Sequence, residues 1–228
     1  KIQDPPQDQI QSLINFYNQG QLQMALDNAS RLLQQFPSSV TLHNINGAIN
    51  ASLGQLDAAI EAYKEAILLR PDYAEAFNNM GNALRGQGKL DEAVASFNNA
   101  LSVNPNFAEA HYNLGNALKE QGKLDEAIAY FNKALVINPD NDDGFNNMGS
   151  ALQEQGQLEE AAVAYNKALA INPNNAGTHN NLGNLLKEQG KLEEAVEAYN
   201  NALAILPDNA DFYYNMACAL RELGKPEE

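Results

Sequence analysis

The side chains best suited to chemistry in this sequence are asparagines that recur every 34 residues. One set comprises Asn79, Asn113, Asn147, Asn181 and Asn215. A second set lies one residue earlier in the repeat and comprises Asn44, Asn78, Asn146 and Asn180, with Tyr112 in place of asparagine in one copy. A third set lies three residues after the first and comprises Asn82, Asn116 and Asn184. A carboxamide offers two donors and two acceptor sites without carrying charge. Repeated at a fixed spacing, such groups favour hydrogen bonding to the amides and carbonyls of an extended peptide backbone.

The spacing belongs to a repeated unit that covers the chain. Its clearest marker is the series Pro37, Pro71, Pro105, Pro139, Pro173 and Pro207. A fixed period of this length indicates stacked copies of one supersecondary unit. We therefore expect a single array over residues 1–228, with copies at about 6–39, 40–73, 74–107, 108–141, 142–175 and 176–209 and a partial copy at 210–228. Positions are counted from the first residue of each copy.

Each copy is predicted to contain two amphipathic helices, called helix A and helix B. Apolar and small residues recur at i, i+3, i+4 and i+7 within 108–118 and again within 124–135, which is the pattern of one buried helix face. Gly122, between the stripes, is placed for a left-handed helix end. Asn138 and Pro139 close helix B, because proline cannot continue the hydrogen-bond ladder.

The two helices are expected to cross closely in most copies. The small residues that would allow this are Gly81, Gly115, Gly149 and Gly183 on helix A and Ala93, Ala127, Ala161 and Ala195 on helix B. The first copy departs from the pattern, with Leu13 at the glycine position and Ala29 where helix B otherwise has an aromatic residue. Such departures are typical of an end unit.

The unit resembles the tetratricopeptide repeat. The matching residues are Leu114, Gly115, Ala127, Phe131, Ala134 and Pro139. The match recurs with small changes over residues 40–209. The resemblance implies an all-α fold, a right-handed superhelical α-solenoid of helix-turn-helix repeats. It also implies that positions 2, 5, 6, 9, 12 and 13 of helix A line a concave groove, and the asparagines stand at positions 5, 6 and 9.

Asparagine is a poor residue for the middle of a helix. It costs roughly 0.5 kcal/mol relative to alanine, so a dozen of them should weaken these helices. We therefore expect something other than stability to favour them, such as gripping a long peptide. The alternative is a solvated polar face that was copied by duplication.

Charged residues flank the asparagines on both sides. The acidic edge comprises Glu75, Glu109 and Asp143, and the basic edge comprises Arg85, Lys119 and Lys187. Mixed edges argue against binding of an acidic peptide C-terminus. Alternatively, these charges are simply solvated helix ends.

Composition narrows the classes of partner. The net charge is −15, from 29 acidic and 14 basic residues, and would repel phosphate backbones and anionic lipid headgroups. We expect no nucleic-acid or membrane partner, no membrane-spanning segment and a cytoplasmic location. His43, His111 and His179 replace a large residue on the buried stripe two repeats apart, so they are expected to pack in the core. With Cys218 as the one cysteine, no metal, cofactor or catalytic site is predicted.

The sequence thus favours a non-enzymatic scaffold that binds an extended peptide or partner segment. The alternative is the substrate-recruiting arm of a larger enzyme, a glycosyltransferase, sulfotransferase or methyltransferase. Residues 108–135 are similar to the repeats of O-linked N-acetylglucosamine transferases, which also carry an asparagine ladder. End-to-end self-association is a further possibility, because Met216 and Leu220 in the partial copy are expected to form an uncovered apolar face.

Overall fold

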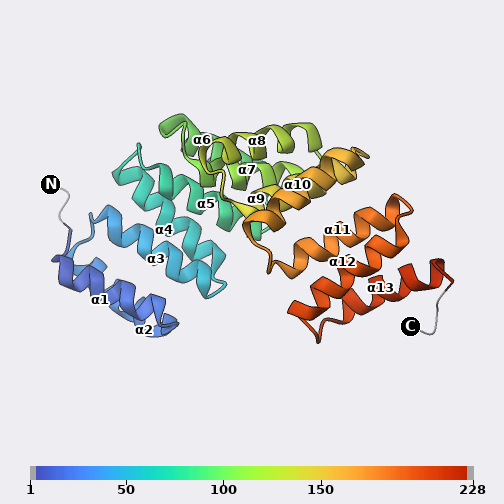
Figure 1. Cartoon of the computed structure of the whole chain (residues 1–228). Coiled ribbons are helices and arrows are strands. Elements are labelled where there is room, and N and C mark those ends of the chain that lie inside the picture. Colours follow the sequence, from blue (N-terminus) through green and yellow to red (C-terminus); the bar gives the residue numbers. More distant parts are fainter. Residues whose placement is uncertain (1–3, 225–228) are drawn as a thin grey trace. The chain divides into compact units, whose positions relative to one another are not determined.

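The computed structural model describes residues 4–224, in which helices alternate with short turns and no strand occurs (Figure 1). The helices are α1 (Gln7–Asn18), α2 (Leu22–Gln35), α3 (Val40–Ser52), α4 (Leu56–Leu69), α5 (Ala74–Gly86), α6 (Leu90–Val103), α7 (Ala108–Glu120), α8 (Leu124–Ile137), α9 (Asp142–Glu154), α10 (Leu158–Ile171), α11 (Ala176–Glu188), α12 (Leu192–Ile205) and α13 (Ala210–Glu222). Odd-numbered helices are helix A and even-numbered helices are helix B. The predicted all-α solenoid of helix-turn-helix repeats is confirmed.

The chain divides into two compact units, residues 1–121 and 122–228. The division falls between α7 and α8, the two helices of residues 108–141, so the single array over 1–228 stays a prediction. Within each unit, consecutive helices pack together, and each A helix also contacts the next A helix. Successive B helices make no such contact within the described residues. The A helices therefore form the tighter layer of each unit.

Glycine ends every A helix that the structure describes. The residue two places after each of these helices has φ between 71 and 79° at Gly20, Gly54, Gly88, Gly122, Gly156, Gly190 and Gly224. This left-handed conformation is costly for residues with a Cβ atom. The predicted helix ends are confirmed, including Gly122. Asparagine closes helix B in the α6, α8 and α10 repeats, also as predicted.

A ring from helix B packs directly on a glycine of helix A. A Cβ atom added to Gly47, Gly81, Gly149 or Gly183 would lie 2.5–2.8 Å from ring carbons of Tyr63, Phe97, Tyr165 or Tyr199, respectively. These rings are almost completely buried. The close crossing predicted from the glycines is therefore real in these four repeats, and the missing side chain is what makes room for the ring.

The first repeat satisfies the same packing requirement with the sizes exchanged. Leu13 occupies the glycine position of α1, and Ala29 occupies the aromatic position of α2. Both are buried in one apolar cluster with Leu32 and Leu42. A larger residue on one helix is thus matched by a smaller one on the other.

The expected apolar face of the partial repeat differs in the structure. Leu220 is buried and Met216 is partly buried, and Met216 packs against the cluster that contains Tyr199 of the preceding repeat. The exposed aromatic residues of α13 are Tyr213 and Tyr214. The prediction that Met216 and Leu220 form an open face was wrong, since Leu220 is buried and Met216 packs against the preceding repeat. The last four residues of this copy lie outside the described residues.

Two glycines of α11 offer a test of the ring contact. Gly183→Ala should lower the free energy of unfolding by about 1–3 kcal/mol, because the new methyl group would meet the Tyr199 ring at 2.6 Å. Gly177→Ala is the matched control, since its Cβ atom would meet nothing closer than 3.4 Å. It should raise stability by about 0.5–1 kcal/mol. Urea denaturation of both variants measures the two effects, and equal stability would contradict the packing argument.

Candidate functional site

The asparagines of the A helices form a hydrogen-bonded ladder between consecutive repeats. In each unit, Nδ2 of position 6 donates to Oδ1 of position 5 in the preceding repeat over 2.9–3.2 Å. The pairs are Asn79 with Asn44, Asn113 with Asn78, Asn181 with Asn146, and Asn215 with Asn180. Partners are separated by 35 residues, whereas the repeat has 34. Consecutive A helices are therefore offset by one residue.

The same offset governs other contacts along the A helices. The hydroxyl of Tyr17 lies 3.0 Å from Oγ of Ser52, again 35 residues away. The Gln153 side chain donates to the Glu188 carboxylate over 2.8 Å at the same separation. One register of polar contacts thus connects neighbouring A helices in both units.

Part of the ladder is buried and fully engaged. Asn78 is 1% exposed and Asn113 is 6% exposed. Oδ1 of Asn78 accepts from Asn113, and its Nδ2 donates to the carboxylate of Glu109 over 3.0 Å. A buried carboxamide needs such partners, because leaving it without them costs about 1–3 kcal/mol.

This geometry corrects the argument drawn from helix propensity. The sequence suggested that the asparagines reduce stability and that either peptide binding or duplication of a solvated polar face accounts for them. At positions 5 and 6 the argument was wrong, because bonds between repeats offset the poor helix propensity. The bonding partner could not be found from one helix alone, since it lies on a neighbouring helix with the one-residue offset.

The asparagines at position 9 differ from the ladder. Asn82, Asn116 and Asn184 are partly buried. Oδ1 of Asn184 accepts from the hydroxyl of Tyr199 in its own repeat over 2.8 Å. Asn82 stands in a repeat whose aromatic residue is Phe97, and its Oδ1 is buried without a hydrogen-bond partner among residues 4–224. At Asn82, position 9 therefore holds an amide oxygen that the fold itself does not use.

The remaining predicted residues at positions 5 and 6 also lie on this face. Asn147 accepts a hydrogen bond from Asn146 over 3.3 Å. Tyr112, which replaces asparagine at position 5, is partly buried.

A cavity of about 400 Å³ opens beside Asn79 and Asn82 in the first unit, and we call it the inner cavity. Its lining comes from α1, α3, α4 and α5 and comprises Tyr17, Ala48, Ala51, Ser52, Leu56, Tyr63, Asn79, Asn82 and Ala83. None of these side chains carries a charge at neutral pH. Burial raises the pKa of the Tyr63 hydroxyl well above its usual range, so it stays protonated. The inner cavity is thus a neutral site with hydroxyl and amide groups.

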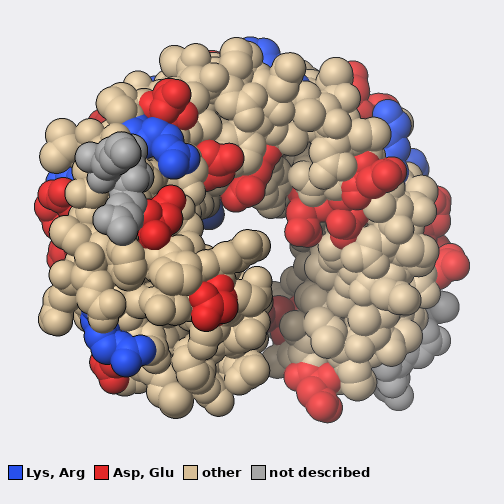
Figure 2. Space-filling model, turned by 90° about the vertical axis from the view of Figure 1, so that its left-hand side faces the viewer, with Lys and Arg blue, Asp and Glu red and all other residues tan. Residues whose placement is uncertain are grey.

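The residues of the predicted charged edges differ in exposure, and one of them has a charged neighbour. Glu75, Glu109 and Asp143 are exposed, whereas Arg85, Lys119 and Lys187 are partly buried. Nε of Arg85 lies 3.8 Å from the carboxylate of Glu120 on the next A helix. On the face shown in Figure 2, acidic side chains are more numerous than basic ones.

The histidines have a structural role at the repeat junctions. Nε2 of His43, His111 and His179 donates to the carbonyl oxygen of Pro37, Pro105 and Pro173, respectively, over 2.9–3.0 Å.

The described residues contain neither a metal site nor a membrane-spanning helix. Within residues 4–224, no group of three or more His, Cys, Asp and Glu side chains could hold a metal ion. Cys218 is free and partly buried. In the same part of the chain, every helix is too short or too polar to cross a membrane.

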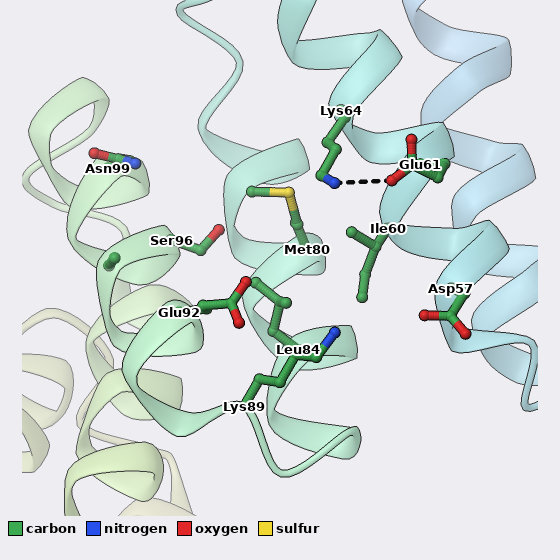
Figure 3. A pocket seen from close by; sticks show the side chains of 11 residues that line it. Asp57, Ile60, Glu61, Lys64, Met80, Leu84, Lys89, Glu92, Ser96 and Asn99 are labelled. Atoms are coloured by element: carbon green, nitrogen blue, oxygen red, sulfur yellow. Dashed lines mark hydrogen bonds and ion pairs between the residues drawn. The ribbon is translucent and has the colours of Figure 1, made fainter.

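A second cavity, of about 310 Å³, lies between the B helices α4 and α6 (Figure 3). Ile60, Met80 and Leu84 supply its apolar surface, and Lys64 at its margin pairs with Glu61 over 2.8 Å. The residues 68 places later, Ile128, Met148 and Leu152, line a similar cavity in the second unit. These cavities are gaps between B helices, and none of the predicted site residues lines them.

Models of the tetratricopeptide repeat family match most of this chain. One matches residues 78–142, a second matches 47–88, 149–190 and 183–224, and a third matches 130–162. The chain therefore belongs to the tetratricopeptide repeat family. No curated protein sequence matches it.

Solved structures share this fold at low sequence identity. PilW, described as a widely conserved type IV pilus biogenesis factor, has a TM-score of 0.84 at 22% identity over 92% of this chain and 99% of its own. PilF from Pseudomonas aeruginosa has a TM-score of 0.79 at 21% identity over 92% and 96%. YrrB, described as a tetratricopeptide repeat protein with an unusual peptide-binding site, has a TM-score of 0.65 at 22% identity over 82% and 96%. These likenesses show the fold.

The ladder can be tested at its most buried pair. Asn113→Ala should lower the free energy of unfolding by about 1–3 kcal/mol, because it leaves Oδ1 of the buried Asn78 without its donor. Asn99→Ala is the control, since Asn99 is an exposed helix residue outside the ladder and alanine should stabilise α6 by a few tenths of a kcal/mol. Chemical denaturation distinguishes the two. A neutral Asn113→Ala variant would contradict a structural role for the ladder.

Proposed function

We propose that this chain is a protein-interaction scaffold that receives an extended peptide segment along the inner face of its A helices. The observation that carries the proposal is an unsatisfied amide beside open space. Oδ1 of Asn82 is buried without a partner among the described residues, and the Asn82 side chain lines the inner cavity. A backbone N–H of an extended chain is the kind of donor that such an acceptor needs.

The ladder supports this role indirectly. Its internal bonds fix the A helices at one register, so the groups on their inner face recur at a constant pitch. An extended peptide also has a constant pitch of about 3.3 Å per residue. A rigid row of uncharged donors and acceptors suits a backbone, which presents the same groups at every residue. The proposed groove residues are those named from the sequence, with position 9 making direct contact and positions 5 and 6 holding the register.

The comparisons support an interaction scaffold in general terms. The family match covers both units, and YrrB is described by its peptide-binding site. The alternative, a recruiting arm of a larger enzyme, rests on the similarity of residues 108–135 to the repeats of O-linked N-acetylglucosamine transferases. The family matches give that finer likeness no support, so the scaffold is the function that we propose.

The proposal predicts that position 9 controls peptide binding. A displayed library of random 12-residue peptides should yield binders to the parent protein, and Asn82→Ala with Asn184→Ala should weaken them by about tenfold or more. Loss of one or two hydrogen bonds of about 1 kcal/mol each accounts for this change. The matched control is Asn99→Ala with Asn201→Ala, which removes two exposed asparagines from B helices.

Fluorescence anisotropy with the selected peptides measures the effect, and thermal unfolding confirms that both double variants are folded. Failure to select any binder, or equal affinity for the parent and the position 9 variant, would contradict the proposed groove.

A further inference from the structure

The hydroxyl of Tyr63 is the exception among the tyrosines that pack on helix-A glycines. In two other repeats the equivalent hydroxyl is satisfied by its own helix A: Tyr165 donates to Gln153 over 3.1 Å, and Tyr199 donates to Asn184 over 2.8 Å. Tyr63 is 2% exposed, yet its hydroxyl has no hydrogen-bond partner among residues 4–224. It lies in the wall of the inner cavity.

The partner is missing because of two substitutions in this repeat. Asn184 stands at position 9 and Gln153 at position 12 of their repeats, whereas residues 40–73 have Ala48 and Ala51 at these positions. Both alanines line the inner cavity. The same small side chains that remove the acceptor therefore also create the space in front of the hydroxyl.

In the next repeat the acceptor is present and the donor is missing. Asn82 occupies position 9, but the aromatic residue that would donate to it is Phe97, which has no hydroxyl. The result is a hydroxyl on α4 and a buried amide oxygen on α5, each without its usual partner, on two side chains that line one cavity. An unpartnered buried polar group is costly, so a ligand that pairs with both recovers that cost on binding.

The geometry points to a subsite of the peptide groove that binds the side-chain carboxamide of a glutamine or asparagine, and we infer that Tyr63 and Asn82 hold it. A carboxamide presents a carbonyl acceptor for the Tyr63 hydroxyl and an amide donor for Oδ1 of Asn82, which a rotation of the Asn82 side-chain amide turns toward the cavity. Because a hydroxyl both donates and accepts, Tyr63 can also pair with the amide end. This inference rests on the proposed function, since the carboxamide is carried by the bound peptide.

The lining of the inner cavity disfavours the other polar side chains. None of its nine residues is charged at neutral pH, so a carboxylate, an ammonium or a guanidinium group would lose its hydration without gaining an ion pair. An apolar side chain would leave both Tyr63 and Asn82 without partners. The volume of about 400 Å³ is ample for a glutamine side chain with the methylene groups against Ala48, Ala51 and Leu56.

A peptide series with one variable residue tests the subsite. The peptides are acetyl-Ser-Ala-Thr-X-Thr-Ala-Ser-N-methylamide, with X as glutamine, asparagine, glutamate, methionine or alanine. The N-methylamide end avoids a second primary carboxamide. Dissociation constants come from NMR titration of the full chain at pH 7. The glutamine or asparagine peptide should bind at least tenfold more tightly than the glutamate, methionine and alanine peptides.

Three variants assign that preference to the subsite. Tyr63→Phe should reduce the preference for the carboxamide to less than threefold while leaving affinity for the alanine peptide unchanged. Tyr199→Phe is the matched control, because its hydroxyl is already bonded to Asn184, and it should keep the preference. Ala48→Asn should supply Tyr63 with the partner that Asn184 gives Tyr199, so it should raise the thermal midpoint and abolish the preference.

The possible failures are distinguishable. Equal binding of all five peptides would overturn the carboxamide subsite and leave the peptide groove standing. A carboxamide preference that survives both Tyr63→Phe and Ala48→Asn would also overturn the assignment. No binding by any peptide of the series, together with failure to select binders from the random library, would overturn the proposed function and the subsite with it.

Discussion

The contact between a helix-A glycine and a helix-B aromatic ring is the constraint on which the rest of the structure depends. At Gly47 the absence of a side chain lets the Tyr63 ring pack against the backbone of α3. This contact fixes the crossing of the two helices and buries the ring, as close packing requires. It also determines the position of the para carbon of the ring, which carries the hydroxyl in tyrosine. In repeats with tyrosine, the hydroxyl reaches toward positions 9 and 12 of helix A, so a packing contact delivers a polar group to the inner face.

A second constraint, the one-residue offset between consecutive A helices, determines how polar groups on that face are used. The offset brings Asn79 against Asn44 and Asn113 against Asn78, which converts residues that weaken a single helix into bonds that connect two helices. The ladder therefore removes positions 5 and 6 in part from ligand binding and makes them structural. At position 9, one turn along, Oδ1 of Asn184 accepts from Tyr199 of its own repeat rather than from the next A helix. In the function that we propose, stability and binding thus depend on neighbouring positions of the same helix.

Much of the fold could be predicted because its signals are local. Gly122 sits at a helix end that only a left-handed residue can form, and Gly81 marks the place where a ring approaches. The site was less accessible. Helical periodicity tells which residues share a face of one helix, but it does not give the offset between helices, so Asn113 was placed in a groove without its bond to Asn78. Leu220 was likewise expected to be open, although it is buried.

Repetition makes small departures from the pattern informative. In one repeat the hydroxyl of Tyr199 and the amide oxygen of Asn184 satisfy each other by a hydrogen bond. Against that standard, Ala48 opposite Tyr63 and Phe97 opposite Asn82 each remove one member of a pair. Either change alone would leave one unsatisfied group, which a protein tolerates at modest cost. Two changes in adjacent repeats leave a hydroxyl and an amide oxygen without partners on side chains that line one cavity. The complementarity that we propose to an external carboxamide therefore comes from the loss of two internal bonds rather than from any added residue.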